Sequence, residues 1–261
     1  MLVLKLLLVA LSVLLATLAA RRFGHAVGGA VAGMPMIAGP ITAVLLIDHD
    51  AAQVRAIALA TLVCLPASIV HIVSFAHAAS RVRWPVGLGL ALAAYLAAGA
   101  LLTHMSLPPA AVCLLAVAVP SIGLWLAPRG LAAHGPVTVP HSELVLRITA
   151  AAAMAAAIIV GADTLPASLS GLLLAVPITG SVLPCFTLPR HGAAATASLM
   201  RGFIQGLHGF AAFFVTLYVA LGWSNRVTAF CVALVASLAA AALVQALRRA
   251  ARRRRPVEQG V

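Results

Sequence analysis

Long apolar stretches follow one another along the chain, and the short segments between them hold most of the charged residues. Each stretch is long enough to cross a hydrocarbon core about 30 Å thick as an α-helix that rises about 1.5 Å per residue. The pattern therefore predicts an all-α integral membrane protein with about nine transmembrane helices. We expect these helices at residues 3–20, 24–47, 55–79, 86–105, 109–128, 145–163, 167–188, 195–222 and 226–248.

The first apolar stretch allows a second interpretation, because residues 16–20 loosely suit the cleavage site of a secretory signal peptide. Arg21 and Arg22 follow this stretch immediately, and positive charge after an apolar segment resists export. We therefore expect the stretch to remain in the protein as its first transmembrane helix.

The composition excludes a soluble domain. Of the 261 residues, 63% are hydrophobic and 8% are charged, whereas soluble domains carry about a quarter of their residues as charges. The four cysteines all lie in apolar stretches without the spacing of a metal site. We therefore expect neither a metal nor a cofactor.

The net charge of +12 does not indicate a nucleic-acid partner, because the basic residues lie in short connecting segments and in the tail at 249–261. The positive-inside rule explains this distribution, and the tail would touch anionic lipid head groups. With nine crossings and a cytoplasmic C-terminus, only Lys5, Arg55 and Arg226 of the 17 Lys and Arg fall outside. We expect the N-terminus outside, and the preference for Arg and Ala suggests a bacterial inner membrane.

The sequence partly repeats itself at a constant offset of 142 residues, as from Leu2 to Leu144. The two repeats, 1–105 and 143–248, each hold four predicted helices, and 106–142 holds a linking helix and a cytoplasmic loop. The informative matches are Lys5 with Arg147, Gly29 with Gly171, Pro35 with Pro177 and His49 with His191. An odd helix between the repeats inverts the second one, a recurring construction of secondary transporters.

The second helix of each repeat is predicted to be broken. Each proline removes a backbone donor and clashes with the preceding turn, so two prolines with glycine between them should unwind the helix. The residues that we assign to these breaks are Gly33, Pro35, Gly39 and Pro40 in the first repeat, and Pro177, Thr179, Gly180 and Ser181 in the second. Unwound backbone at this depth would surround a solute site; the alternative is that the prolines only kink the helices and the glycines only aid packing.

The helix at 195–222 carries one polar stripe, in which Arg201, Gln205 and His208 share a face. We predict that this face meets the two breaks and contributes to the solute site, with Arg201 either functional or topogenic. His71, on the equivalent helix of the first repeat, is a further candidate. Beside the stripe, Ser198, Gly202 and Gly206 form a surface of small residues that lets another helix approach closely.

Three functions fit these observations. The first is a small secondary transporter that moves a neutral or anionic solute, such as an organic anion or an amino-acid-like molecule, by alternating access. The second is a translocase for a lipid or a polyprenyl phosphate, and the third is a membrane scaffold or assembly protein. An enzyme is not expected, because the sequence lacks a Ser-His-acid set, a His-Glu-x-x-His motif and a phosphate-binding loop. The expected partners are the bilayer, a small solute and, as an option, a second copy of the chain.

Overall fold

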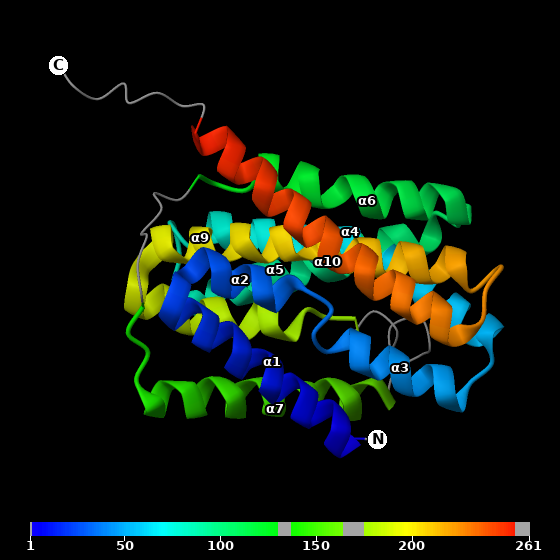
Figure 1. The fold of residues 1–261 in the computed structure, drawn as a ribbon. Helices are drawn as coiled ribbons and strands as arrows, with labels where there is room; N and C mark the ends of the chain where they lie inside the picture. The colour runs from blue at the N-terminus through cyan, green and yellow to red at the C-terminus, as the bar shows by residue number, and fades with distance from the viewer. Residues whose placement is uncertain (1, 130–136, 164–174, 254–261) are drawn as a thin grey trace.

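A computed structural model describes residues 2–129, 137–163 and 175–253, and these residues form helices and no strand (Figure 1). The helices are α1 (Leu2–Phe23), α2 (His25–Gly33), α3 (Ala38–Asp48), α4 (Ala51–Ala78), α5 (Trp84–His104), α6 (Pro109–Leu126), α7 (His141–Asp163), α9 (Ile178–Ala220) and α10 (Arg226–Arg253). The prediction of an all-α protein is confirmed for this part of the chain.

Eight helical segments of the described chain are long and apolar enough to cross a membrane, with α2 and α3 taken together as one segment. The protein is therefore a multi-pass membrane protein. The predicted helix at 167–188 falls partly on residues 164–174, which lie outside the described residues. Its remainder is the start of α9. The division into repeats at 1–105 and 143–248, with 106–142 between them and a tail at 249–261, stays a prediction.

Helix α9 has 43 residues, which at about 1.5 Å each would span about twice the thickness of a hydrocarbon core. It turns back at Gly192, whose φ of 76° and ψ of −178° are backbone angles that glycine adopts without steric cost. A first limb, 178–191, and a second limb, 193–220, therefore run in opposite directions (Figure 1). The separate helices predicted on either side of residue 192 correspond to these limbs.

The segment between His25 and Asp48 is interrupted: α2 ends at Gly33, Met34 is extended, and α3 begins at Ala38. Pro35 lies in this interruption. The second break was predicted over 176–184, but the chain is helical from Ile178 onward and Pro184 lies inside α9. The prediction of unwound backbone over 178–184 is therefore wrong. Val176 and Pro177 are not helical, and because residues 164–174 lie outside the described residues, an interruption before Ile178 stays a prediction. Pro177 immediately precedes α9, at a position where a backbone N–H would have no helical partner, so the N–H that proline lacks is not missed there. It therefore starts α9 rather than unwinding it.

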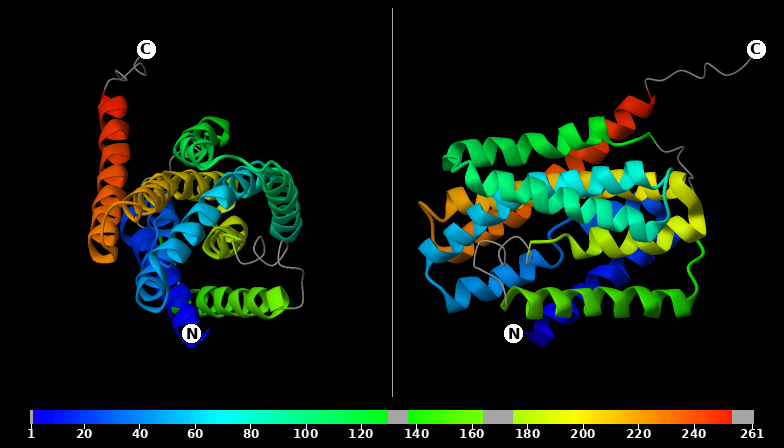
Figure 2. Two further views of the ribbon diagram at one scale, coloured as in Figure 1. Left: turned by 90° about the vertical axis from the view of Figure 1, so that its right-hand side faces the viewer. Right: turned by 180° about the vertical axis from the view of Figure 1, so that it is seen from behind.

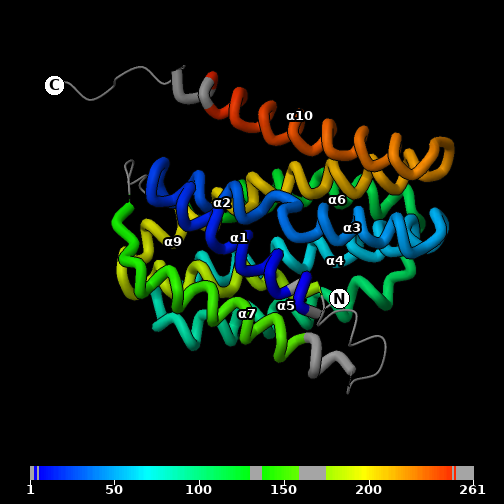
Figure 3. Tube along the Cα trace, turned by 60° about the horizontal axis from the view of Figure 1, so that its bottom comes forward, coloured from blue at the N-terminus to red at the C-terminus, as the bar shows by residue number. Residues whose placement is uncertain are grey.

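The ends of the helices sort into two groups. The C-terminal ends of α1, α4, α6 and α10, the N-terminal ends of α2, α5 and α7, and the bend of α9 lie at one end of the bundle, on the left in Figure 1. Figure 3 shows the bend of α9 and the start of α7 on the left from a second direction. The basic residues of these segments are Arg21, Arg22, Arg81, Arg83, Arg129, Arg147, Arg190 and those of the α10 terminus. We call this the basic end. That it faces the cytoplasm stays a prediction.

The second limb of α9 crosses α2 at backbone-to-backbone distance. A Cβ atom placed on Gly202 or Gly206 would overlap the carbonyl oxygen of Ala26 or Ala30 in α2. Reciprocally, a Cβ on Gly29 or Gly33 of α2 would overlap the carbonyl oxygen of Leu199 or Phe203. Pairs of glycines four residues apart on both helices permit this approach. The prediction that the surface of small residues around Gly202 and Gly206 receives another helix is confirmed.

Gly206→Ala should lower the apparent melting temperature of the purified protein in detergent. The added methyl group meets the backbone of Ala30 and Gly33, and overpacking of this kind costs about 1–3 kcal/mol. Gly89→Ala in α5 is the matched control, since nothing lies within 4 Å of a Cβ there. It should leave stability unchanged or raise it by up to about 1 kcal/mol. Equal melting temperatures for both variants would contradict the close crossing.

Candidate functional site

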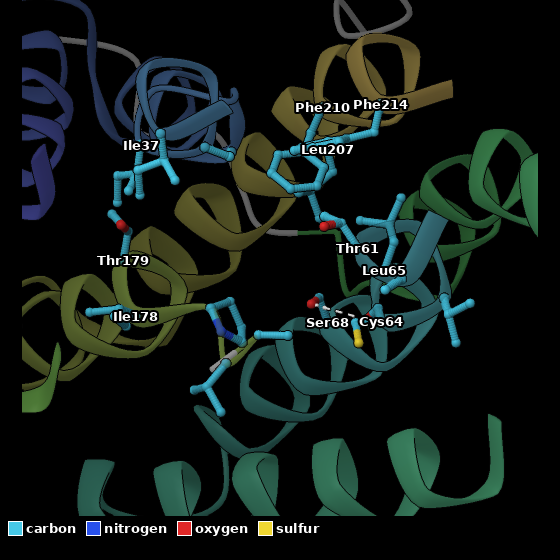
Figure 4. A pocket seen from close by; sticks show the side chains of 18 of the residues that line it. Ile37, Thr61, Cys64, Leu65, Ser68, Ile178, Thr179, Leu207, Phe210 and Phe214 are labelled. Atoms are coloured by element: carbon cyan, nitrogen blue, oxygen red, sulfur yellow. Dashed lines mark hydrogen bonds between the residues drawn. The ribbon is translucent and has the colours of Figure 1, made fainter. Parts of the chain in front are cut away.

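A cavity of about 890 Å³ lies between α1, the α2–α3 interruption, α4, the end of α5 and both limbs of α9. We call it the central cavity; Figure 4 shows it from close by. Its volume falls within the range of about 300–1,000 Å³ that is usual for small-molecule sites. A single drug-sized solute would fit in it.

The central cavity brings together the interruption of the first repeat and the start of α9. Gly33, Ile37 and Ala38 line it from one segment, and Pro177 and Thr179 line it from the other. Figure 4 shows Ile37 and Thr179 reaching toward each other at one side of the cavity. Both α3 and α9 begin at this cavity, so the positive ends of two helices lie beside it.

The polar lining of the cavity consists of hydroxyl groups, and no charged side chain of the described residues lines it. These hydroxyls belong to Ser12, Thr42, Thr61, Ser68, Thr103, Ser106 and Thr179. Thr42, Thr61 and Ser68 donate to carbonyls one turn earlier in their own helices, over 2.7, 2.8 and 3.3 Å. Their oxygen lone pairs stay available to a solute. Hydrogen-bond donors come from the first turn of α9, because the first helical N–H bond there is that of Ser181 to Pro177 and the N–H groups before it lack helical partners. In the first turn of α3, by contrast, the N–H groups of Gly39 and Ile41 already donate to Pro35 and Ile37.

The second limb of α9 supplies the apolar wall. Phe203, Leu207, Phe210 and Phe214 follow each other at intervals of three and four residues and all line the cavity. Figure 4 shows the side chains of the last three grouped together on this limb. This face was not predicted to line the site, because an apolar stripe at helical spacing is also what ordinary core packing produces. The polar stripe on the same helix drew attention to the opposite side.

Several predicted site residues lie next to the cavity without lining it. Pro35 and Gly39 are buried, whereas Pro40 is exposed. A Cβ on Gly180 would approach the Phe203 ring to 3.2 Å, so this glycine makes room for a wall residue. That Pro35, Gly39, Pro40 and Gly180 belong to a solute site stays a prediction.

Arg201, Gln205 and His208 point away from the central cavity. Arg201 Nη1 donates to the carbonyl oxygens of Leu124 and Ala127, over 2.9 and 2.8 Å, at the end of α6. His208 Nε2 lies 3.2 Å from the hydroxyl of Ser121, which is also in α6. Gln205 accepts a hydrogen bond from Arg248 of α10. The three share one face, as predicted, but that face meets α6 and α10, because the opposite, aromatic face is turned to the cavity. The expectation that they meet the breaks is not fulfilled.

His71 and Ser181 form a buried pair beneath the cavity. The Ser181 hydroxyl lies 3.1 Å from His71 Nε2 and joins α4 to the first limb of α9. Both side chains are fully buried. Sequence reasoning placed both residues in the site for separate reasons, and the structure adds that they are hydrogen-bonded to each other.

A buried ion-pair network at the basic end was not foreseen. Glu143 accepts from Arg147 at 2.6 Å and from Arg190 of the α9 bend at 3.0 Å. The His25 and His191 rings lie nearby, with centroids 4.8 Å apart. This helix was predicted to start at residue 145, which placed Glu143 in a loop, whereas α7 begins at His141. The acid therefore lies in the first turn of a packed helix.

Among the described residues, no group of three or more His, Cys, Asp or Glu side chains could hold a metal ion. Comparisons with protein-family models, curated proteins and solved structures find no match to this chain. The site is therefore interpreted from its own geometry.

Arg201→Ala should lower the melting temperature in detergent, because it removes the donor to two carbonyls at the end of α6. Hydrogen bonds to charged groups contribute about 1.5–3 kcal/mol. Arg201→Lys keeps the charge with a shorter donor, so its melting temperature should lie between those of Arg201→Ala and the unmodified protein. A melting temperature of Arg201→Ala equal to that of the unmodified protein would show that these bonds do not hold α6 in place.

Glu143→Gln should destabilise the protein strongly, because it leaves the guanidinium of Arg147 without a counter-charge. Arg147 is buried, with 2% of its surface exposed. Removing one member of a buried ion pair costs about 3–5 kcal/mol. Arg190→Gln is the control, because its side chain is 45% exposed and exposed pairs contribute about 0–1 kcal/mol. Thermal unfolding of both variants tests the difference, and a smaller loss for Glu143→Gln than for Arg190→Gln would refute it.

Proposed function

We propose that this protein is a small secondary transporter that moves a neutral or anionic organic solute through the central cavity by alternating access. One observation carries the proposal: the α2–α3 interruption and the start of α9 line the same cavity. In secondary transporters, interrupted helices from corresponding positions of two repeats surround the substrate. Pro177 lines the cavity and Pro35, its partner at the offset of 142 residues, adjoins Met34, which also lines it.

The chemistry of the lining supports the proposed class of solute. A cation would find no carboxylate among the described lining residues. A carboxylate or a carbonyl oxygen would meet the unpaired N–H groups in the first turn of α9, and the positive end of α3 would favour its charge. The hydroxyl oxygens would accept hydrogen bonds from an amino or hydroxyl group of the solute. The phenylalanine rings would cover its apolar part.

The distribution of basic residues also supports an orientation of the bundle in the membrane. If the basic end faces the cytoplasm of a bacterium, as the positive-inside rule requires, the N-terminus lies outside. The cavity is lined by residues from the beginning of α4 and the end of α5, such as Ile57 and Thr103. It would then lie in the outer half of the membrane, and the α2–α9 crossing would close it toward the cytoplasm.

A second candidate function, translocation of a lipid or a polyprenyl phosphate, is favoured by a smaller, almost entirely apolar groove. This groove of about 400 Å³ lies between α5, α7 and the first limb of α9. A scaffold or assembly protein would have no use for a solute-sized cavity lined by hydroxyls, so the central cavity favours transport over that alternative.

Solutes of the right class should raise the melting temperature of the purified protein, because a ligand that binds only the folded state stabilises it by an amount set by concentration over Kd. The panel is aliphatic carboxylates, aromatic carboxylates and neutral amino acids, each at millimolar concentration. At 100 times Kd the stabilisation reaches about 2.7 kcal/mol. Thr179→Trp should abolish it by filling the cavity.

Leu114→Trp is the matched control, since Leu114 is 73% exposed and faces away from the bundle core. It should keep both the thermal shift and the uptake of the same solute into proteoliposomes. A shift that persists in Thr179→Trp would place solute binding elsewhere. A panel without any shift would count against transport of these classes.

A further inference from the structure

The first limb of α9 separates two hollows. On one side is the central cavity, and on the other is the apolar groove between α5 and α7. The groove is lined by Trp84, Leu88, Ala150, Met154, Ser181, Val182, Cys185, Phe186 and Pro189. Figure 2 shows the first limb, in yellow-green, between α5 and α7. Trp84 and Leu88 come from the start of α5 and Pro189 adjoins the α9 bend, whereas Ala150 and Met154 lie near the middle of α7. The groove therefore lies nearer the basic end than the central cavity, which is lined by the beginning of α4 and the end of α5.

The His71–Ser181 pair lies in the wall between these hollows. Ser68 and Thr179, which precede the two residues by three and two positions, line the central cavity. Ser181 itself lines the groove. The imidazole is fully buried between them. A small rearrangement of the first limb would therefore expose His71 to one hollow or to the other.

The hydrogen bonds define where the imidazole carries its proton. The Ser181 hydroxyl lies 3.1 Å from the Pro177 carbonyl oxygen and 3.1 Å from His71 Nε2. A carbonyl only accepts, so Ser181 donates its single proton to Pro177 and must accept from His71 Nε2–H. His71 Nδ1 is then the bare nitrogen, and it is buried without a hydrogen-bond partner.

The surroundings of the His71 ring allow Nδ1 to bind a second proton during part of the transport cycle. The backbones of Ala91 and Gly180 interact with the ring. From α5 the ring faces Tyr95, at 6.3 Å between centroids, and from α9 it faces Ser181. No charged side chain of the described residues interacts with it. A charged imidazole would thus favour a conformation that admits water from a hollow, since buried charge without a partner is costly.

We propose that His71, held by Ser181 between the central cavity and the groove, is the site that takes up the coupling proton of transport. This inference rests on the proposed transport function and names its coupling ion. Imidazole is the side chain whose ordinary titration falls between pH 5 and 8. Proton binding at His71 releases the first limb from the closed arrangement, and it thereby shifts the population between cavity-open and groove-open states.

Buried His25 and half-buried His191 and His208 are placed differently. His208 bonds to Ser121 of α6, on the side of the second limb away from the cavity. His25 and His191 lie at the basic end beside the Glu143–Arg147 pair. Within the described helices, His71 combines full burial, an unpaired ring nitrogen and a place between two hollows.

Proton binding at His71 and the conformation of the first limb can both be measured without any solute. The outcome of these measurements is therefore independent of the thermal-shift test of transport. Val70–His71 is the only Val–His pair in the sequence. Labelling with carbonyl-¹³C valine and ¹³C,¹⁵N histidine therefore identifies the His71 backbone amide by NMR in the unmodified chain, and the carbons of the same residue connect that amide to the ring nitrogens. We expect a bare Nδ1 at pH 8.5 and a protonated Nδ1 at pH 4.5. A ring that stays neutral over this whole range overturns the proposal.

Two native thiols report the conformation, because Cys64 lines the central cavity and Cys185 lines the groove. With Cys113 and Cys231 replaced by alanine, the ratio of their maleimide reaction rates should change about tenfold between pH 8 and pH 5, which corresponds to about 1.4 kcal/mol between the two states. The same ratio in His71→Gln should change less than about twofold, since glutamine takes up no proton. His208→Gln is the control and should keep the full change. An unchanged pH response in His71→Gln would show that the proton acts elsewhere.

Discussion

The close crossing of α2 with the second limb of α9 is the contact on which the rest of the structure depends. Four glycines, Gly29 and Gly33 on one helix and Gly202 and Gly206 on the other, bring two backbones together without intervening side chains. The crossing ends at Gly33, where α2 also ends, and Phe203 lies opposite. Gly33 and Phe203 both line the central cavity. The same contact that holds the bundle together therefore fixes where its interior opens.

The lipid environment explains why the irregular backbone lies where it does. In a hydrocarbon core, unpaired N–H and C=O groups are tolerated only inside protein or beside a water-filled cavity. The α2–α3 interruption and the start of α9 both adjoin the central cavity, and the bend at Gly192 lies at the basic end. Most hydroxyl groups of the cavity wall donate to their own helices. The wall can thus be polar toward a solute without leaving its own donors unpaired.

The buried polar groups of the bundle hold helices together in specific pairs. Arg201 binds the carbonyls at the end of α6, Glu143 ties α7 to the α9 bend through Arg190, and Ser181 ties α4 to the first limb. The His71–Ser181 contact is costly to break because both members are removed from water. The contact through Arg190 is weaker, because that side chain is 45% exposed. The charges lie in these contacts and at the helix ends. The described lining of the cavity carries none, and this is the basis for assigning a neutral or anionic solute.

The sequence by itself determined the membrane-spanning helices, the surface of small residues at Gly202 and the helix interruption at Pro35. Each depends on a local property: the length of an apolar run, the spacing of glycines, or the backbone donor that proline lacks. Only the tertiary structure decided which face of the second limb meets the cavity. The stripe at Arg201 and the stripe at Phe203 are both regular, and the choice between them depends on where α2, α6 and α10 pack. The burial of Glu143 and the pairing of His71 with Ser181 were likewise hidden, since each joins residues of different helices. Local patterns specify helices, and the packing of their faces specifies the site.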